Sequence, residues 1–372
     1  MENSTLKKEL DELQSLAKER TVKTQNIEYD LETLVKKIQK NVIKLNPDYQ
    51  RNHRWGDVES SRLIESLILN IPIPTVYLSQ DVDVDDEVSD DVARYSVIDG
   101  QQRLTAILTF MTNGFELDGL EVLQPLNGMK YDELPPFLKR RLEERTIKCL
   151  RIDSTVDHQV KYDIFERLNS GSVVLESQEL RNAIYRGKFN DMIKKLALNE
   201  KFNKLLNIKM GNRENNNKVK KMQDVEYVLR FFAFDNNELM NMKKSFKKFL
   251  SEQMEKFNKC SDQELKQMEK HFLVTLDKVY DELGGEAFAK YKYEDGKFKP
   301  TLQSRFNASM YDAIMISVSE NMRNGILKID ESRKKQLMDL FKSTEFNECI
   351  NGSTNDKSKI VKRIEIVKGV LS

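Results

Sequence analysis

The sequence predicts an α+β protein, with a small mixed sheet in its N-terminal half and an all-helical C-terminal half. Three observations support this class. The β-branched strand patterns lie before residue 156, helical periodicity dominates after it, and 372 residues exceed one ordinary domain. Apolar residues make up 39% of the chain and charged residues 33%, so a core can form beneath a highly charged surface.

The N-terminal half alternates predicted helices with predicted strands. The helix over 30–39 begins after Asp30, which is a suitable N-cap. The amphipathic segment 57–70 ends at IPIP, because proline cannot continue a helix. The predicted helices cover 4–20, 30–39, 57–70, 104–111 and 135–142; the predicted strands cover 75–79, 94–98, 115–119, 120–123 and 146–152. The strands 75–79 and 94–98 are expected to form a hairpin-like pair.

The C-terminal half shows helical periodicity almost throughout. The polar stretch GNRENNNKVKK at 211–221 lacks apolar periodicity, so it is predicted to be a linker or mobile loop. The predicted helices cover 156–168, 176–186, 189–199, 222–234, 238–258, 262–282, 303–321, 332–342 and 357–370.

The composition excludes several classes of protein. Lys and Arg number 61 and Asp and Glu 60, so no global basic field draws the chain to DNA or to a membrane. Three widely spaced cysteines argue against a disulfide framework or a cysteine-rich zinc site. No apolar run approaches the roughly 20 residues of a membrane span, and the first residues are charged. We therefore expect a cytoplasmic protein that does not enter a membrane.

The stretch YSVIDGQQRLTA at 95–106 is the most informative motif. An apolar strand pattern stops at Asp99 and Gly100, and a helical stripe follows. Gly100 permits the backbone of a sharp strand-to-helix turn, and the start of a helix attracts anions. Arg103 adds a planar, charged fork suited to phosphate oxygens. Gln101 and Gln102 add amide groups, and Asp99 could hold a hydrated divalent metal.

A plainer interpretation stands beside this one. Asp99 can be only an N-cap, and Gly100 only a turn residue. Trp55, the only tryptophan, fits a packing anchor better than a platform on which a base stacks.

The motif occurs among other segments that together resemble a known family. DGQQRLTAI follows YQRNHRW and LIESLILNIPIPTVYL, and FERLNSGSVVLESQELRNAIYRGKF comes later. In this order, over roughly residues 28–200, the segments resemble the N-terminal domain of GmrSD-type restriction systems, which belongs to the ParB/sulfiredoxin-like superfamily of NTPases. The resemblance implies a ParB/sulfiredoxin-like nucleotide-binding domain over 28–200. Helical periodicity predicts a helical extension over 1–27 before it and a helical domain over 201–372 after it.

The resemblance also implies a site for a nucleoside triphosphate with Mg²⁺ or another divalent cation. The implied nucleotide-binding residues are Gly100, Gln101, Gln102, Arg103, Tyr49, Gln50, Arg51, Asn169 and Arg181. The implied metal ligands are Asp99 and Glu166, and the implied catalytic residues are Asp99, Gln102, Arg103 and Glu166. Without the resemblance, the same residues have plainer interpretations. Residues 49–51 fit a solvated loop, and Glu166 and Asn169 fit the end of a helix. Arg181 fits a salt bridge along its own helix.

The restriction enzymes of this type carry a second domain with a His-Asn-His nuclease. This chain has only His53, His158 and His271, and they show no paired ligand spacing. The sequence therefore favours an NTP-hydrolysing sensor or regulatory component of an anti-phage defence system, acting with a nuclease effector in trans, for example of the HEPN type. The alternatives are a DNA-binding recruitment module without enzymatic activity and a metal-dependent ParB-like nuclease. DNA and a second copy of the chain stay open as partners.

Overall fold

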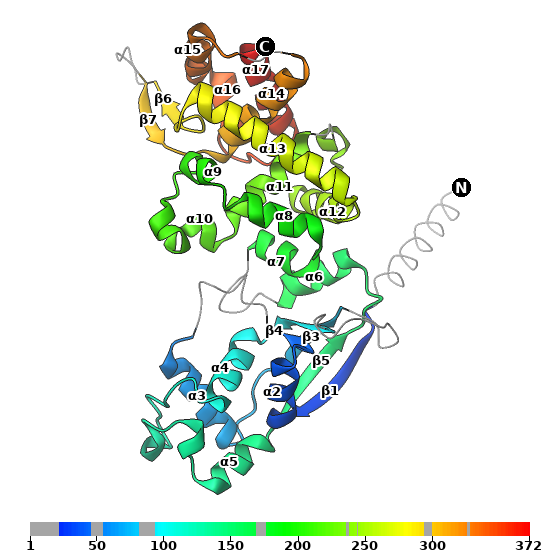
Figure 1. Ribbon diagram of the computed structural model, residues 1–372, viewed down its shortest axis with the longest axis vertical. Helices are drawn as coiled ribbons and strands as arrows, with labels where there is room; N and C mark the ends of the chain where they lie inside the picture. The colour runs from blue at the N-terminus through cyan, green and yellow to red at the C-terminus, as the bar shows by residue number, and fades with distance from the viewer. Residues whose placement is uncertain are drawn as a thin grey trace, which may run out of the picture. The chain divides into compact units, whose positions relative to one another are not determined.

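The structure is a computed structural model of the whole chain (Figure 1). The residues that it describes are 22–45, 55–81, 94–168, 176–235, 238–243, 245–293, 300–325 and 328–372. The chain divides into two compact units, Met1–Leu175 and Glu176–Ser372. The first is α+β with a five-stranded mixed sheet and the second is mainly helical, which confirms the predicted fold class.

The sheet of the N-terminal unit contains three predicted strands and two that the sequence did not reveal. Its order is β1 (Thr24–Asp30), β5 (Thr146–Ile152), β3 (Val76–Gln80), β4 (Tyr95–Asp99) and β2 (Ile43–Lys44). The pairs β1–β5 and β3–β4 are antiparallel, and β5–β3 and β4–β2 are parallel. The antiparallel pairing of β3 with β4 confirms the expected hairpin-like pair.

Helices build the core of this unit against the sheet. These helices are α2 (Leu31–Gln39), α3 (Asp57–Ile68), α4 (Gln101–Met111) and α5 (Pro136–Glu143), and α6 (His158–Leu168) follows β5. The Asp30 carboxylate accepts a hydrogen bond from the Thr33 N–H at 2.7 Å, which confirms Asp30 as the N-cap of α2. Helices α2 to α5 share one apolar core with the sheet, and they lie together in the lower part of Figure 1.

The predicted strands over 115–119 and 120–123 are wrong, because residues 115–123 form a loop. Two polar side chains of α3 hold this loop through its backbone. The Ser61 hydroxyl accepts from the Asp118 N–H at 2.9 Å, and the buried Glu65 carboxylate accepts from the N–H groups of residues 121–123 at 2.7–3.3 Å. Backbone groups satisfied by side chains need no partner strand.

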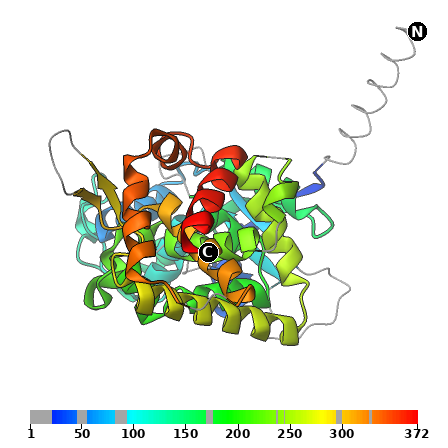
Figure 2. The ribbon, with the colours of Figure 1, turned by 90° about the horizontal axis from the view of Figure 1, so that it is seen from above.

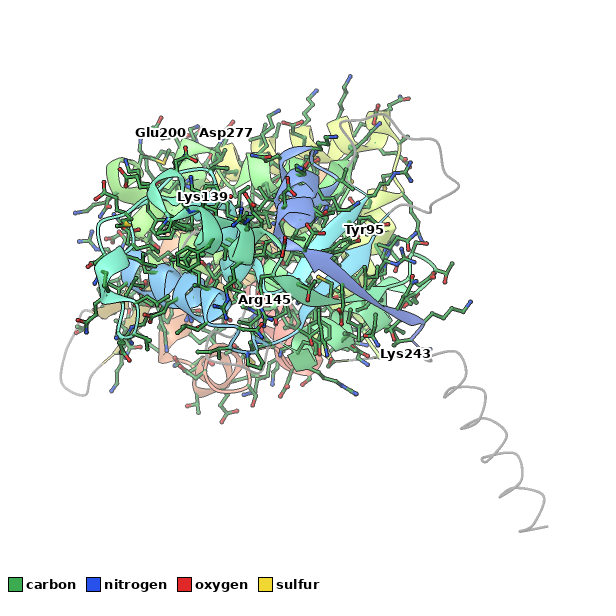
Figure 3. All side chains as sticks on the ribbon, turned by 90° about the horizontal axis from the view of Figure 1, so that it is seen from below. Tyr95, Lys139, Arg145, Glu200, Lys243 and Asp277 are labelled. Carbon is green, nitrogen blue, oxygen red and sulfur yellow. The ribbon has the colours of Figure 1, made fainter. Side chains whose placement is uncertain are left out.

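The turn after α5 is tied to the end of α3. The Arg145 guanidinium donates to the Asn70 side chain and, at 3.4 Å, to the Ile71 carbonyl. In Figure 3, Lys139 from α5 and Arg145 appear on the side of the N-terminal unit that is seen from below.

The C-terminal unit packs its helices around α11 and α14, which are buried on nearly all sides. Figure 2 shows α17 beside α14. The α-helices are α7 (Ser177–Ile184), α8 (Lys188–Leu196), α9 (Glu200–Leu205), α10 (Asn217–Lys220), α11 (Gln223–Asp235), α12 (Phe246–Asn258), α13 (Asp262–Leu283), α14 (Ala308–Arg323), α15 (Glu331–Asp339), α16 (Thr344–Ile350) and α17 (Lys357–Leu371). The short 3-10 helices are η4 (Met210–Asn215), η5 (Glu238–Asn241) and η6 (Leu340–Lys342). The unit is not entirely helical, since β6 (Lys290–Lys292) and β7 (Thr301–Ser304) form an antiparallel pair.

The predicted linker over 211–221 is also wrong, since these residues form parts of η4 and α10. Arg213 fastens the segment to the core. Its guanidinium donates to the buried Asp224 carboxylate, to the Asn203 side chain at 3.1 Å and to the Ala197 carbonyl at 3.3 Å. The segment is held to the core by a buried ion pair and not by a stripe of apolar side chains, so its sequence shows no helical periodicity.

Two buried arginines share one carboxylate deeper in the same unit. Arg230 of α11 donates to both oxygens of Asp312 on α14, with 2.9 Å from Nε to Oδ1. Arg363 of α17 donates to Oδ2 of the same Asp312 and to the Thr354 carbonyl. All three charged side chains are buried, so the contacts between these helices depend on a charge network as well as on apolar packing.

Candidate functional site

The candidate site lies where β4 turns into α4. Asp99 ends β4, and Gly100 is the N-cap of α4 with φ = +97°. A Cβ at Gly100 would come within 2.9 Å of the Val76 Cγ2 atom on β3. Both the left-handed backbone and this close approach require glycine. The predicted role of Gly100 as a turn residue is confirmed, whereas Asp99 stands one residue before the N-cap.

Arg103 extends from the first turn of α4 back toward the sheet. Because β3 and β4 are antiparallel, the residues just before β3 lie at the same end as Asp99. The Arg103 guanidinium donates to the Asp99 carboxylate at 2.7 Å and to the Pro74 carbonyl, and it lies 3.5 Å from the Thr75 carbonyl. Burial lowers the pKa of Arg103, and the charge of Asp99 counteracts that effect.

This geometry changes the predicted role of Arg103. The sequence suggested a fork open to phosphate oxygens, but the side chain is only 11% exposed and its fork contacts protein acceptors. The Asp99 side chain is more open, at 43% exposed. In this conformation the Arg103 guanidinium is paired with Asp99, and the first-turn backbone N–H groups of α4 are the other donors at this turn.

Gln102 connects a second sequence segment to the same turn. Its side-chain oxygen accepts a hydrogen bond from the backbone N–H of Trp55 at 3.3 Å. The end of YQRNHRW, the start of TVYL and DGQQR therefore meet at one place, although they are separated in the sequence. The carbonyl acceptors at Pro74 and Thr75 were not predicted, because carbonyl groups leave no signal in residue identity.

The other predicted site residues are not all found at this turn. Tyr49, Gln50, Arg51 and Asn169 lie outside the described residues. Gln101 is buried at the start of α4, and Glu166 is exposed near the end of α6.

Arg181 departs most clearly from its predicted role in binding nucleotide. It is fully buried in the C-terminal unit, where it donates to Gln178 at 2.9 Å and to Glu226 at 3.0 Å. The alternative prediction for Arg181 was a salt bridge along its own helix. Arg181 does form a salt bridge, with Glu226, but this pair joins α7 to α11.

A divalent cation is compatible with the turn at Asp99. Magnesium commonly takes one or two carboxylates, with waters and phosphate oxygens completing its coordination. Asp99 supplies one partly exposed carboxylate at the start of α4. Within the described ranges, no three His, Cys, Asp or Glu side chains gather into a metal-binding cluster.

Comparison with protein families identifies the segment that carries this turn. Residues 31–186 match the family model described as "GmrSD restriction endonuclease, N-terminal domain". Residues 31–186 form a GmrSD-type N-terminal domain. The match includes the strands β2 to β5 and the turn at Asp99 and Gly100. The chain thus carries a domain of a restriction-like defence system. Searches of curated proteins and of solved structures found no match.

The GmrSD-type domain does not coincide with one compact unit. Its match runs to residue 186, past the division after Leu175, so its last residues belong to α7 of the helical unit. The boundary after residue 200 stays a prediction. Across the described part of the chain, every helix is too short or too polar to cross a membrane.

Proposed function

We propose that the chain binds a nucleoside triphosphate with a divalent cation at the start of α4, and that it serves as the NTP-hydrolysing sensor or regulatory component of a restriction-like anti-phage system. A nuclease effector in trans would cut the invading DNA. The carrying observation is the turn of the GmrSD-type domain, where Asp99, left-handed Gly100 and Arg103 adjoin a helix start.

The Asp99–Arg103 pair gives the binding step a physical form. In the structure these two charges neutralise each other at 2.7 Å. A bound cation would supply positive charge beside Asp99 and the phosphates, and it would lower the cost of assembling their negative charges. Asp99 would hold the cation and Arg103 would hold the phosphate oxygens, so each of the two charges would keep a partner.

The helix start provides the fixed part of the site. First-turn N–H groups of α4 point along the helix axis, where they favour an anion whatever Arg103 does. Gln102 stands in the same turn and can orient a water molecule for attack. Glu166 is proposed as the second acid that assists, from α6.

Binding measurements on two variants test the exchange of partners. Asp99→Asn removes the competing charge while keeping the shape of the side chain. We expect nucleotide affinity to fall about 10- to 100-fold with Mg²⁺ and to rise without it, because Arg103 is then released. Arg103→Lys retains the charge but loses the fork, and affinity should fall under both conditions.

The control is Arg62→Ala, which removes an exposed arginine paired with Glu121 at 2.8 Å elsewhere in the domain. It should leave affinity unchanged in isothermal calorimetry. A folded Arg103→Lys or Arg103→Ala protein that binds Mg²⁺–ATP as tightly as the unchanged chain would overturn the assignment. Phosphate release then decides whether hydrolysis accompanies binding.

A further inference from the structure

The sequence suggested that Trp55 is a packing anchor, but the residue is partly open to solvent and is bonded to the first turn of α4. Its side chain is 38% exposed. Tryptophan is highly buried on average, since its large ring loses favourable contacts when it faces water. An indole that is partly open to water carries a free-energy cost that its contacts with the described residues do not offset.

The position of Trp55 is fixed from both sides. The backbone N–H of Trp55 donates to the side-chain oxygen of Gln102 in the first turn of α4. The next residue, Gly56, is the N-cap of α3. The indole therefore projects from a backbone that is tied to the same turn as Asp99 and Gly100. This backbone link does not require any residue of the preceding segment.

We propose that the indole of Trp55 stacks on the base of the nucleotide whose phosphates lie at the start of α4. The inference rests on the proposed function, because it needs phosphates at that helix. It adds the residue that binds the other end of the ligand. Aromatic side chains bind bases by stacking on the face of the ring, and one such contact contributes substantially to affinity.

The same chemistry sets the specificity of the site. Stacking uses the flat face that every base presents, whereas discrimination between bases needs hydrogen bonds to their edges. A site built on Trp55 accepts all four ribonucleoside triphosphates. Purines bind more tightly than pyrimidines because they cover more of the indole.

The test uses the fact that Trp55 is the only tryptophan in the chain. Its fluorescence is recorded while the full chain is titrated, with excess Mg²⁺, by ATP, GTP, CTP, UTP or inorganic tripolyphosphate. All four nucleotides should quench the emission, and saturating tripolyphosphate should leave it nearly unchanged. In calorimetry, Trp55→Ala should weaken nucleotide binding about 5- to 100-fold and leave tripolyphosphate binding unaltered.

Two further variants complete the experiment. Trp55→Phe keeps a smaller ring and should recover part of the affinity. Phe137→Ala removes another exposed aromatic side chain, 61% exposed on α5, and should change nothing. Unchanged nucleotide affinity in Trp55→Ala, or an equal loss for nucleotides and tripolyphosphate, overturns the stacking role while leaving the proposed function intact. If neither ligand binds the unchanged chain, the proposed function fails and this inference fails with it.

Discussion

At the scale of single residues, the turn at Gly100 depends on the absence of a side chain. Its positive φ costs any other residue about 1–2 kcal/mol, and the Val76 methyl group lies where a Cβ would point. Gly128 provides a matched comparison, because it has φ = +84° but no heavy atom within 4 Å of a Cβ built there.

We expect Gly100→Ala to lower the free energy of unfolding by at least about 1 kcal/mol more than Gly128→Ala, because only the first adds a steric overlap to the backbone strain. Urea unfolding followed by Trp55 fluorescence reports on this unit. Equal losses in the two variants would show that Val76 moves aside at no cost.

The residues of the candidate site were predictable to different degrees. The strand-to-helix turn and the need for glycine follow from the motif itself. The partner of Arg103 could not be predicted. The sequence does not show whether an arginine four residues after an aspartate turns toward that aspartate or toward solvent. The burial of Arg181 was equally hidden, since its partner Glu226 lies 45 positions away.

At the scale of elements, two helices begin with the same capping box in different surroundings. Glu179 accepts from the Glu176 N–H at 2.7 Å at the start of α7, and Glu264 accepts from the Ser261 N–H at 2.7 Å at the start of α13. Burial raises the pKa of Glu179 to about 7, with a smaller contribution from the charge of Glu176. Bonds from Ser261 lower the pKa of the exposed Glu264.

These opposite shifts predict opposite pH dependences. An unfolded glutamate ionises near pH 4.3, so between about pH 4.5 and 7 the folded state holds a proton on Glu179 that the unfolded state has lost. Stability therefore falls as the pH rises through that range. Glu179→Gln should remove this fall, and its stability relative to the unchanged chain should increase by about 2–3 kcal/mol between pH 5 and 8.

Glu264→Gln is the control, because it alters the same capping position without the buried carboxyl group. It should show no such increase in thermal unfolding at the two pH values. If the two variants respond alike, burial of Glu179 does not control the proton.

The elements themselves were predicted best where apolar periodicity was strong. Helices α3, α4, α11 and α13 and strands β3, β4 and β5 appear near their predicted positions. Strand β1 was missed because TQNIEYD is polar; it is an edge strand that follows β5 over seven residue pairs. Pairing with a neighbouring strand can stabilise a strand whose own residues have a low β-propensity.

At the scale of the whole molecule, ion pairs connect elements that are distant in sequence. Lys201 of α9 lies 2.7 Å from Asp277 of α13, and Figure 3 labels Asp277 beside Glu200 at the rim. Such exposed pairs contribute little to stability. The Asp312 network differs because its charges are buried, and removing Asp312 takes away the carboxylate that both arginines share.

Asp312→Asn should therefore destabilise the C-terminal unit by about 3–5 kcal/mol, because Arg230 and Arg363 both lose their shared carboxylate. Asp262→Asn, which removes an exposed carboxylate 2.7 Å from Lys188, should cost less than about 1 kcal/mol. Circular dichroism during urea unfolding compares the two. A loss in Asp312→Asn no larger than that in Asp262→Asn would show that the arginines find other partners.

The position of Arg363 on α17 has a consequence for synthesis on the ribosome. Domains fold as units while the chain emerges from its N-terminal end. Until α17 has left the exit tunnel, the side of α14 that packs against α17 is uncovered, and Asp312 holds only one of its two arginines. The GmrSD-type sheet can assemble early, whereas the helical unit must wait. Nascent chains in which α17 is absent or still inside the tunnel should therefore be the ones that require a chaperone.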